Sequence, residues 1–409
     1  MSAAERAAEA PAGWRTRGWG IVGALSITET VSWGILYYAF AVFLIPMQDA
    51  LGFSTAELTG AYSLALLVSA VAGIAVGRYL DRHSPRGLMT AGSIAGTLLV
   101  LAWSQVDGLA AFYALWIAIG LVMAVVLYEP AFTVLAKWFP DADQRRRAMT
   151  ALTLVAALAS FIFLPLSQAL VDAHGWRDAL VILAVILGAI TIPLHALVLR
   201  RAPRLDRAAS MRAASSATAR DALRSASFWL LSTAFFLGTF TGIAMTVLAI
   251  PFLLERGYGA PFAAFAVGLV GFSQIPGRVV FAAIGSRLPR EFAISAVFAL
   301  IGGGIAVLVG LDTTATVLAG LVLLGMGNGM ATLARATAIA DLYGGASYGT
   351  INSVAAAGTT GARAAGPVTA ALYAAAVGYS ALLWTLAGIA VIAGCLAYRA
   401  ERQAAASIS

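Results

Sequence analysis

RRAPRLDRAASMRAASSATARDALR, residues 200–224, is the one long polar segment in this chain of 409 residues. It is rich in Ala, Ser and Arg and lacks an apolar run of membrane-spanning length. The sequence on both sides consists mainly of apolar runs of about 20 residues or more, which is the length that a transmembrane helix needs. The segment therefore predicts a linker between two helical halves.

Six apolar runs precede this linker and six follow it. They lie at about 18–46, 55–80, 87–106, 109–137, 147–170, 178–199, 226–254, 260–286, 291–311, 314–341, 346–376 and 379–399. The sequence therefore predicts an all-α integral membrane protein with twelve transmembrane helices in two six-helix bundles. The predicted parts are a cytoplasmic N-terminal tail at 1–17, an N-terminal bundle at 18–199, a cytoplasmic linker at 200–225, a C-terminal bundle at 226–399 and a cytoplasmic C-terminal tail at 400–409.

The composition argues against a soluble protein. Hydrophobic residues make up 61% of the chain and charged residues 11%, and the mean hydropathy is +0.88. Soluble domains are roughly half apolar and a quarter charged. The single cysteine, Cys395, rules out an internal disulfide, and the three histidines show no metal-ligand spacing. There is no P-loop or dinucleotide-binding glycine pattern. We therefore expect no cofactor, no metal and no enzymatic activity.

The basic residues indicate the orientation of the chain in the membrane. The formal net charge is +7, but its arginines lie in alternate gaps between the apolar runs. This distribution is a topology signal and not a nucleic-acid-binding patch. It predicts a multi-pass protein of a bacterial cytoplasmic (inner) membrane, with both termini cytoplasmic. In this orientation the loops on the opposite side contain only two arginines, Arg177 and Arg256. We expect a monomer whose partners are membrane lipid and a small-molecule substrate.

The loop after the second apolar run carries a motif, GRYLDRHSPRG at residues 77–87. Gly77 permits close helix approach, while Asp81 can accept hydrogen bonds from a neighbouring helix N-terminus or pair with a cation. Arg82 and Arg86 can anchor the loop at the membrane surface. The pattern resembles the loop signature of the major facilitator superfamily. This resemblance implies a fold of two six-helix bundles with inverted repeats, in which the loop stabilises the outward-open state.

A narrower resemblance rests mainly on the N-terminal half. Its residues are 36–40 (LYYAF), Trp138-Phe139 with Arg145–Arg147, Pro165-Leu166 and Gly175-Trp176-Arg177. They are similar to the monocarboxylate transporters and the oxalate–formate antiporters. The resemblance implies that Arg278 binds a carboxylate and that Arg363 is a second cation. Two ionisable residues that are common in that family are missing here. Ala41 and Val42 stand where a lysine is common, and Gln274 stands where an aspartate is common.

Five ionisable residues fall well inside the predicted spans, where each charge costs at least about 2.5–3.5 kcal/mol. They are Glu29, Glu129, Arg278, Arg335 and Arg363. The excess of arginine favours an anionic substrate. Arg278 and Arg363 are candidate anion ligands, or members of permanent structural pairs. Glu129 and Arg335 occupy matching places in the two halves and are candidates for a gate or structural ion pair. Glu29 either couples protons or neutralises an arginine.

Two tyrosines complete the candidate binding residues. The phenol groups of Tyr38 and Tyr128 can help an arginine to hold a carboxylate, although most aromatic residues in membrane helices face lipid or pack. The resulting hypothesis is a secondary active transporter of a small organic anion, by symport or antiport with protons or a counter-anion. It moves its substrate by alternating access around a site near the midplane. The alternatives are a proton-coupled exporter of drugs or metabolites and a transporter-like sensor.

Overall fold

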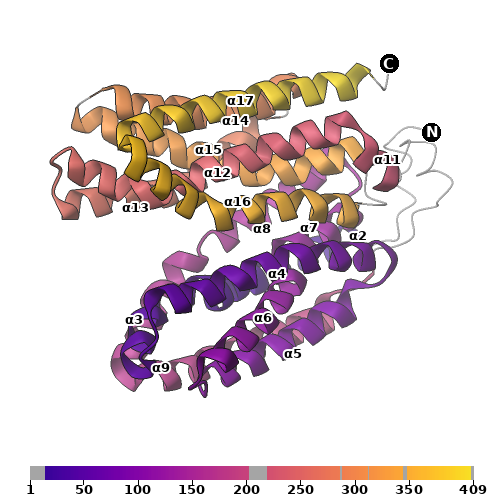
Figure 1. Ribbon diagram of the computed structural model, residues 1–409. Helices are drawn as coiled ribbons and strands as arrows, with labels where there is room; N and C mark the ends of the chain where they lie inside the picture. The colour runs from indigo at the N-terminus through magenta and orange to yellow at the C-terminus, as the bar shows by residue number, and fades with distance from the viewer. Residues whose placement is uncertain (1–13, 202–218, 286–287, 312, 344–347, 407–409) are drawn as a thin grey trace. The chain divides into compact units, whose positions relative to one another are not determined.

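The computed structural model describes residues 14–201, 219–285, 288–311, 313–343 and 348–406. Within these ranges all regular secondary structure is helical (Figure 1). The chain divides into two compact units, each described here by itself. Unit 1 comprises Met1–Leu58 and Arg82–Arg207, and unit 2 comprises Thr59–Asp81 and Ala208–Ser409.

The helices follow the predicted apolar runs closely. Unit 1 holds α2 (Trp14–Ser32), η1 (Trp33–Tyr38), α3 (Ala39–Leu51), α5 (Pro85–Trp103), α6 (Leu109–Val126), α7 (Tyr128–Trp138), α8 (Ala142–Ala156), α9 (Ala159–Pro193) and η2 (Leu194–Val198). Unit 2 holds most of α4 (Thr55–Arg82), with α11 (Ala219–Arg224), α12 (Ala226–Glu255), α13 (Ala260–Ile284), α14 (Arg290–Gly310), α15 (Thr314–Tyr343), α16 (Tyr348–Val377) and α17 (Tyr379–Ala406). Helix α17 thus continues past the predicted end at 399.

Ten helical segments in the described ranges are long and apolar enough to cross a membrane. One of them, Ala142–Val198, is 57 residues long and contains a non-helical residue, Gly175, so it holds two spans. Helix α16 is rich in Gly, Ala and Thr, carries Arg363 and falls outside the ten. Counting both spans of the long segment and adding α16 gives the twelve predicted spans.

The fourth span is broken in the middle. Helix α6 ends at Val126, Leu127 is extended with φ −95° and ψ −168°, and α7 begins at Tyr128. Pro130 explains the break, because a proline ring collides with the carbonyl group four residues earlier, which here belongs to Val126. The break gives α7 its own N-terminus inside the span, with Glu129 in its first turn.

Aromatic side chains form the core of unit 1 at one end of α5. Trp103 is fully buried and its indole N–H contacts the sulfur of Met47 at 3.1 Å. Its ring lies 5.4 Å from the ring of Phe43 and 4.9 Å from that of Trp116. Phe40 packs edge-on against Trp116 at 4.9 Å. Large rings therefore hold α3, α5 and α6 together.

Glycines, by contrast, bring the helices of unit 2 into backbone contact. A Cβ atom added to Gly329 of α15 would collide with the carbonyl oxygen of Gln274 and lie 2.7 Å from its Cα. Gly325, one turn earlier, meets the backbone of Val270 in the same way. Helices α12, α14, α15 and α17 also lie side by side in Figure 1. Small residues at four-residue spacing are a common means of close helix contact in membranes.

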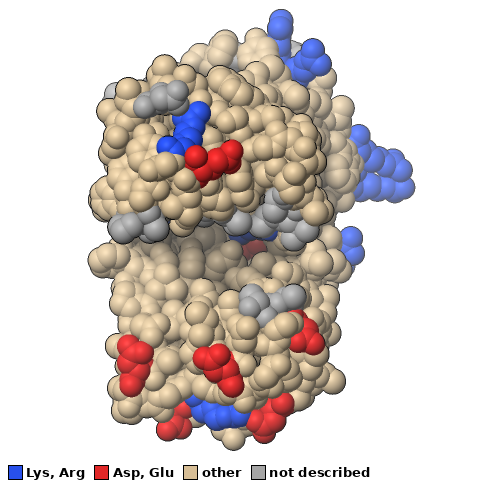
Figure 2. Space-filling model, turned by 60° about the vertical axis from the view of Figure 1, so that its left-hand side comes forward, with Lys and Arg blue, Asp and Glu red and all other residues tan. Residues whose placement is uncertain are grey.

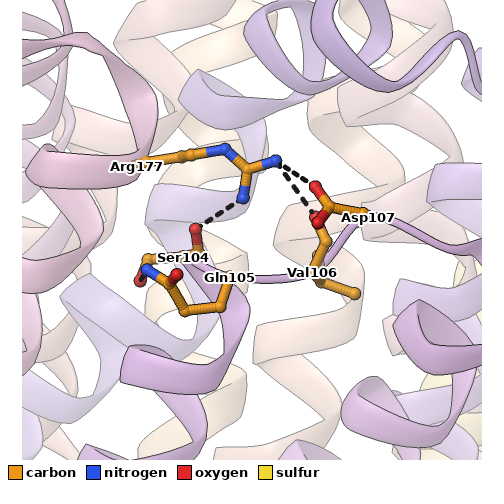
Figure 3. A network of polar contacts seen from close by, with 5 residues as sticks. All are labelled: Ser104, Gln105, Val106, Asp107 and Arg177. Carbon is orange, nitrogen blue, oxygen red and sulfur yellow. Dashed lines mark hydrogen bonds and ion pairs between the residues drawn. The ribbon is translucent and has the colours of Figure 1, made fainter.

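An arginine fastens the end of α5 in unit 1 (Figure 3). Arg177 donates hydrogen bonds to the carbonyl oxygens of Ser104, at 2.7 Å, and Val106, at 3.4 Å, and it pairs with the carboxylate of Asp107. Its guanidinium group also lies 4.3 Å from the centre of the Trp176 ring. The arrangement satisfies carbonyl groups that the helix end leaves without intrahelical partners.

Unit 2 has a similar arrangement at the end of α14. Arg256 donates to the carbonyl oxygens of Leu308, at 3.3 Å, and Val309, at 2.7 Å, and lies 4.6 Å from the centre of the Phe252 ring. Arg177 and Arg256 are the two arginines that the sequence analysis places on the less basic side of the membrane. Both are engaged by helix carbonyl groups.

The surface fits a membrane environment. Figure 2 shows broad uncharged areas, with basic and acidic side chains gathered in a few clusters. Several large apolar side chains are exposed, among them Phe161 at 80%, Phe272 at 70% and Val71 at 72%. Such exposure of scattered large apolar groups suits contact with lipid chains.

Candidate functional site

Glu29 is the most buried acid in the spans of unit 1. Its side chain is fully buried in α2, and its Oε2 accepts a hydrogen bond of 3.1 Å from the indole N–H of Trp33. The described residues offer no hydrogen-bond partner to the other carboxyl oxygen, Oε1. A buried carboxyl group with one unsatisfied oxygen is costly to keep charged, so this position calls for a functional explanation.

Trp33, the partner of Glu29, packs with three tyrosines, and we call Trp33, Tyr37, Tyr38 and Tyr128 the aromatic cluster. The Trp33 ring lies 4.9 Å from Tyr37, 6.3 Å from Tyr38 and 4.9 Å from Tyr128, between ring centres. Three members come from the π-helix η1, in which residues five apart are hydrogen-bonded neighbours. This geometry explains why Tyr38, five residues after Trp33, reaches the same cluster as Tyr37.

The second acid of unit 1, Glu129, lies next to the aromatic cluster. It follows Tyr128 directly, is half-buried and interacts electrostatically with Glu29. Its place in the first turn of α7 suits a negative charge, because the N-terminus of a helix carries a partial positive charge. The break in the fourth span, at Leu127, thus creates a favourable environment for an acid inside the membrane.

Unit 2 contains the three arginines that lie well inside the predicted spans. Arg278 on α13 is 5% exposed and stands next to Gly277, where α13 touches the backbone of α15. Arg363 on α16 is half-buried, and no hydrogen-bond or ion-pair partner of its side chain is found in the described part of the chain. A guanidinium group of this kind is available to an anion.

Arg335 has a partner that the sequence did not predict. Its Nη1 donates a hydrogen bond of 3.0 Å to Oδ1 of Asn352, which is fully buried in α16. One turn away, the hydroxyl of Tyr348 donates to the carbonyl oxygen of Ala336 at 3.2 Å. These two bonds tie α15 to the first turns of α16. The pairing of Arg335 with Glu129 involves both units and stays a prediction.

The loop motif places its aspartate at the N-terminus of a helix. The carboxylate of Asp81 accepts hydrogen bonds from the backbone N–H groups of Gly349 and Thr350, both at 2.8 Å, and from the Thr350 hydroxyl at 2.6 Å. A Cβ atom at Gly77 would collide with the carbonyl oxygen of Gly349, so α4 approaches α16 closely there. The structure thus shows the hydrogen bonding at a helix N-terminus that the sequence analysis considered for Asp81.

The two motif arginines differ from Asp81 in their surroundings. Arg82 and Arg86 are exposed at the surface. The carbonyl oxygen of Arg82 accepts a hydrogen bond of 3.2 Å from Arg201, which joins this loop to the residues after η2. Exposed arginines at the end of a span are suited to lipid headgroups.

Three contributors to these sites were missed in the sequence analysis: Trp33, Thr350 and Asn352. Trp33 had a local signal, because it stands four residues after Glu29 and such residues face each other on a helix. Thr350 and Asn352 are distant in sequence from their partners, Asp81 and Arg335. No local pattern in a single sequence could have paired them.

The comparisons with known proteins identify the family. The sequence profile of the Major Facilitator Superfamily matches residues 25–332, which is more than half of the chain. The chain therefore belongs to the major facilitator superfamily. As a member of this family of membrane transporters, it is a multi-pass membrane transporter and not an enzyme.

Two curated relatives match parts of the chain. The oxalate:formate antiporter of Oxalobacter formigenes is 26% identical over 268 residues, which cover 64% of this chain and 62% of the antiporter. The uncharacterized MFS-type transporter YcxA of Bacillus subtilis (strain 168) is 26% identical over 159 residues, or 38% of each chain. The chain thus matches less than two thirds of the length of either relative.

Solved structures share the fold over almost the whole chain. The human organic anion transporter MFSD10 (TETRAN) has a TM-score of 0.72 at 15% identity, covering 93% of this chain and 99% of its own. The fucose:proton symporter FucP of E. coli has a TM-score of 0.71 at 15% identity, covering 93% and 98%. At this identity the likeness shows the fold alone, which is the predicted major facilitator fold.

Proposed function

We propose that this transporter moves a small organic anion, such as a carboxylate, by alternating access. The observation that carries the proposal is the half-buried guanidinium group of Arg363, for which the described residues provide no counter-ion. A cation inside a membrane span is costly unless it is paired. An anionic substrate would supply the missing partner.

Three other residues are proposed as substrate ligands. In unit 2, Arg278 is proposed as the principal anion ligand, because guanidinium groups bind carboxylates through two parallel hydrogen bonds. In unit 1, the phenol groups of Tyr38 and Tyr128 are proposed as additional donors. The relation to the oxalate:formate antiporter supports a carboxylate, although it covers only 64% of the chain. The location proposed is a bacterial cytoplasmic membrane, with both termini cytoplasmic.

Glu29 is proposed as the site of proton coupling. Its unsatisfied Oε1 is costly in the charged state and can bind a proton instead. Symport of an anion with a proton would use the protonation and deprotonation of Glu29. Exchange of two anions would not require it. The same feature would serve the alternative function, a proton-coupled exporter of drugs or metabolites. Resistance to cationic or neutral compounds upon expression would favour that alternative.

Transport by purified protein in proteoliposomes tests the proposal. Radiolabelled oxalate and formate are offered first, followed by a panel of other carboxylates chosen by thermal shift. The wild-type protein is expected to take up at least one of them. Arg278→Ala is expected to abolish uptake, and Arg363→Gln is expected to lower the initial rate by about tenfold or more, because a hydrogen bond to a charged group is lost.

The matched control is Arg402→Gln on α17, which removes the same charge from an exposed position. This variant should transport like the wild type, and all variants should elute as monodisperse protein. Unchanged uptake in Arg278→Ala and Arg363→Gln would refute the proposed anion ligands. Failure of the wild-type protein to move any anion of the panel would refute the substrate class.

A further inference from the structure

Glu29 and the aromatic cluster are joined by one residue. The indole N–H of Trp33 donates to Glu29, while the ring of the same side chain contacts Tyr38 and Tyr128. In the described part of the chain, the Trp33 N–H is the only hydrogen-bond donor to the Glu29 carboxyl group. A change in the charge of Glu29 therefore acts first on the orientation of the indole.

The elements that pack against α2 offer few other ways for a change in the charge of Glu29 to affect the rest of unit 1. Helices α7, α8 and α9 and the π-helices η1 and η2 pack against α2. Glu129 of α7 acts electrostatically on Glu29, and η1 contributes the tyrosines of the cluster. On η2, His195 is bound to the hydroxyl of Ser93 at 2.7 Å. On α8, Arg145 donates to backbone carbonyl groups.

The π-helix adds a second reason to single out Trp33. Gly34 follows it, and a Cβ atom there would collide with the ring of Phe163 on α9. The backbone after Trp33 is thus held against α9, while the Trp33 side chain is only half-buried. The Trp33 side chain is therefore able to respond, whereas the backbone next to it is held in place. π-Helical turns within α-helices are frequently found at functional sites.

We propose that Trp33 is a positioning residue that transmits the protonation state of Glu29 to the aromatic cluster. This rests on the proposed function, in which Tyr38 and Tyr128 contact the anion and Glu29 carries the proton. When Glu29 is charged, its carboxylate holds the indole N–H. When Glu29 is protonated, that bond weakens and the ring is free to shift against the tyrosines. By linkage, an anion at the cluster and a proton on Glu29 influence each other's binding equally.

Infrared difference spectroscopy tests this link without a substrate. Spectra of the full-length protein in lipid are recorded between acidic and alkaline pH, with ring-deuterated tyrosine to assign the tyrosine bands. In the wild type we expect a carboxylic acid band that Glu29→Gln abolishes, together with tyrosine bands that Glu29→Gln also abolishes. In Trp33→Phe, which keeps an aromatic ring but loses the N–H, the carboxylic acid band should persist at a shifted wavenumber and the tyrosine bands should be lost.

Trp384→Phe is the matched control, since Trp384 is 53% exposed on α17, and it should give the wild-type spectrum. The inference is overturned if Trp33→Phe leaves both sets of bands unchanged, or if Glu29→Gln removes no band from the wild-type spectrum. These outcomes do not depend on transport. If the spectra behave as expected and no carboxylate is transported, the substrate class is wrong and the link between Glu29 and the cluster stands.

Discussion

The two units of this transporter pack their helices by opposite means. In unit 1, large rings such as those of Trp103 and Trp116 fill the space between helices. In unit 2, glycines such as Gly325 and Gly329 remove that space and allow backbones to touch. Rings tolerate small adjustments through side-chain rotation, whereas backbone contact leaves no side chain that can move aside. We therefore expect the stability of unit 2 to be more sensitive to added side-chain volume. The stability of unit 1 should be more sensitive to the removal of side-chain volume.

The units also differ in charge. The acids well inside the spans, Glu29 and Glu129, both lie in unit 1, and the three arginines well inside the spans lie in unit 2. An acid can take up a proton, whereas an arginine keeps its charge in proteins. Under the proposed function this difference separates the roles, with unit 1 responding to pH and unit 2 presenting a constant positive charge to the anion.

The largest expected effect comes from adding volume in unit 2. Gly329→Val would place two methyl groups against the backbone of Gln274, and helices α13 and α15 would have to separate. We expect a loss of at least about 3 kcal/mol of stability, at the upper end of overpacking costs, and little monodisperse protein on size exclusion. Gly303→Val is the control, because a Cβ atom at that position on α14 meets nothing within 4 Å. Equal yields of the two variants would contradict glycine-mediated packing.

Removing volume from unit 1 should have a smaller effect. Trp103→Ala would leave a cavity among Phe40, Phe43 and Trp116. We expect a loss of about 2–3 kcal/mol, measured as a lower thermal unfolding temperature in detergent, since lost contacts rather than transfer from water dominate inside a membrane. The exposed Trp384→Ala should change the unfolding temperature much less. A larger loss in Trp384→Ala would show that the ring core does not stabilise unit 1.

The smallest effect is expected at Arg177, which binds the end of α5 in unit 1. Arg177→Gln removes donors from two carbonyl groups and a carboxylate. We expect a loss of about 1–2 kcal/mol of stability. Asp107 is 79% exposed, so the part of this loss that comes from the ion pair should be smaller at high salt. Thermal unfolding at low and high salt checks this, and a loss that does not change with salt would argue against the carboxylate's contribution.

The membrane-spanning helices could be predicted from the sequence because contact with lipid requires long apolar runs. The predicted run 226–254 corresponds to α12, Ala226–Glu255, and 314–341 corresponds to α15, Thr314–Tyr343. The π-helix η1 was not predicted, because apolar composition is the same for α- and π-helical turns. The break at Leu127 had a signal in Pro130, but Pro251 and Pro276 lie inside helices that continue. A proline alone therefore does not predict a break.

The charged residues of the candidate site could be predicted from the sequence, but their contacts could not. A charged residue in an apolar run stands out in any single sequence, which is how Glu29 and Arg363 were identified. Their surroundings depend on tertiary structure. The hydrogen bonds of Asp81 with Gly349 and Thr350 join residues more than 260 positions apart, and only the folded chain brings them together.

The reversal of the chain at Gly175 has a practical consequence for experiments. The fifth and sixth spans meet at this one residue of positive φ, 78°, with helix on both sides. Proteases and inserted epitopes need an exposed stretch of irregular chain. We therefore expect the connection at Gly175 to resist both. Residues 52–54, which are non-helical between α3 and α4, offer a better place for a tag or an engineered cleavage site on unit 1.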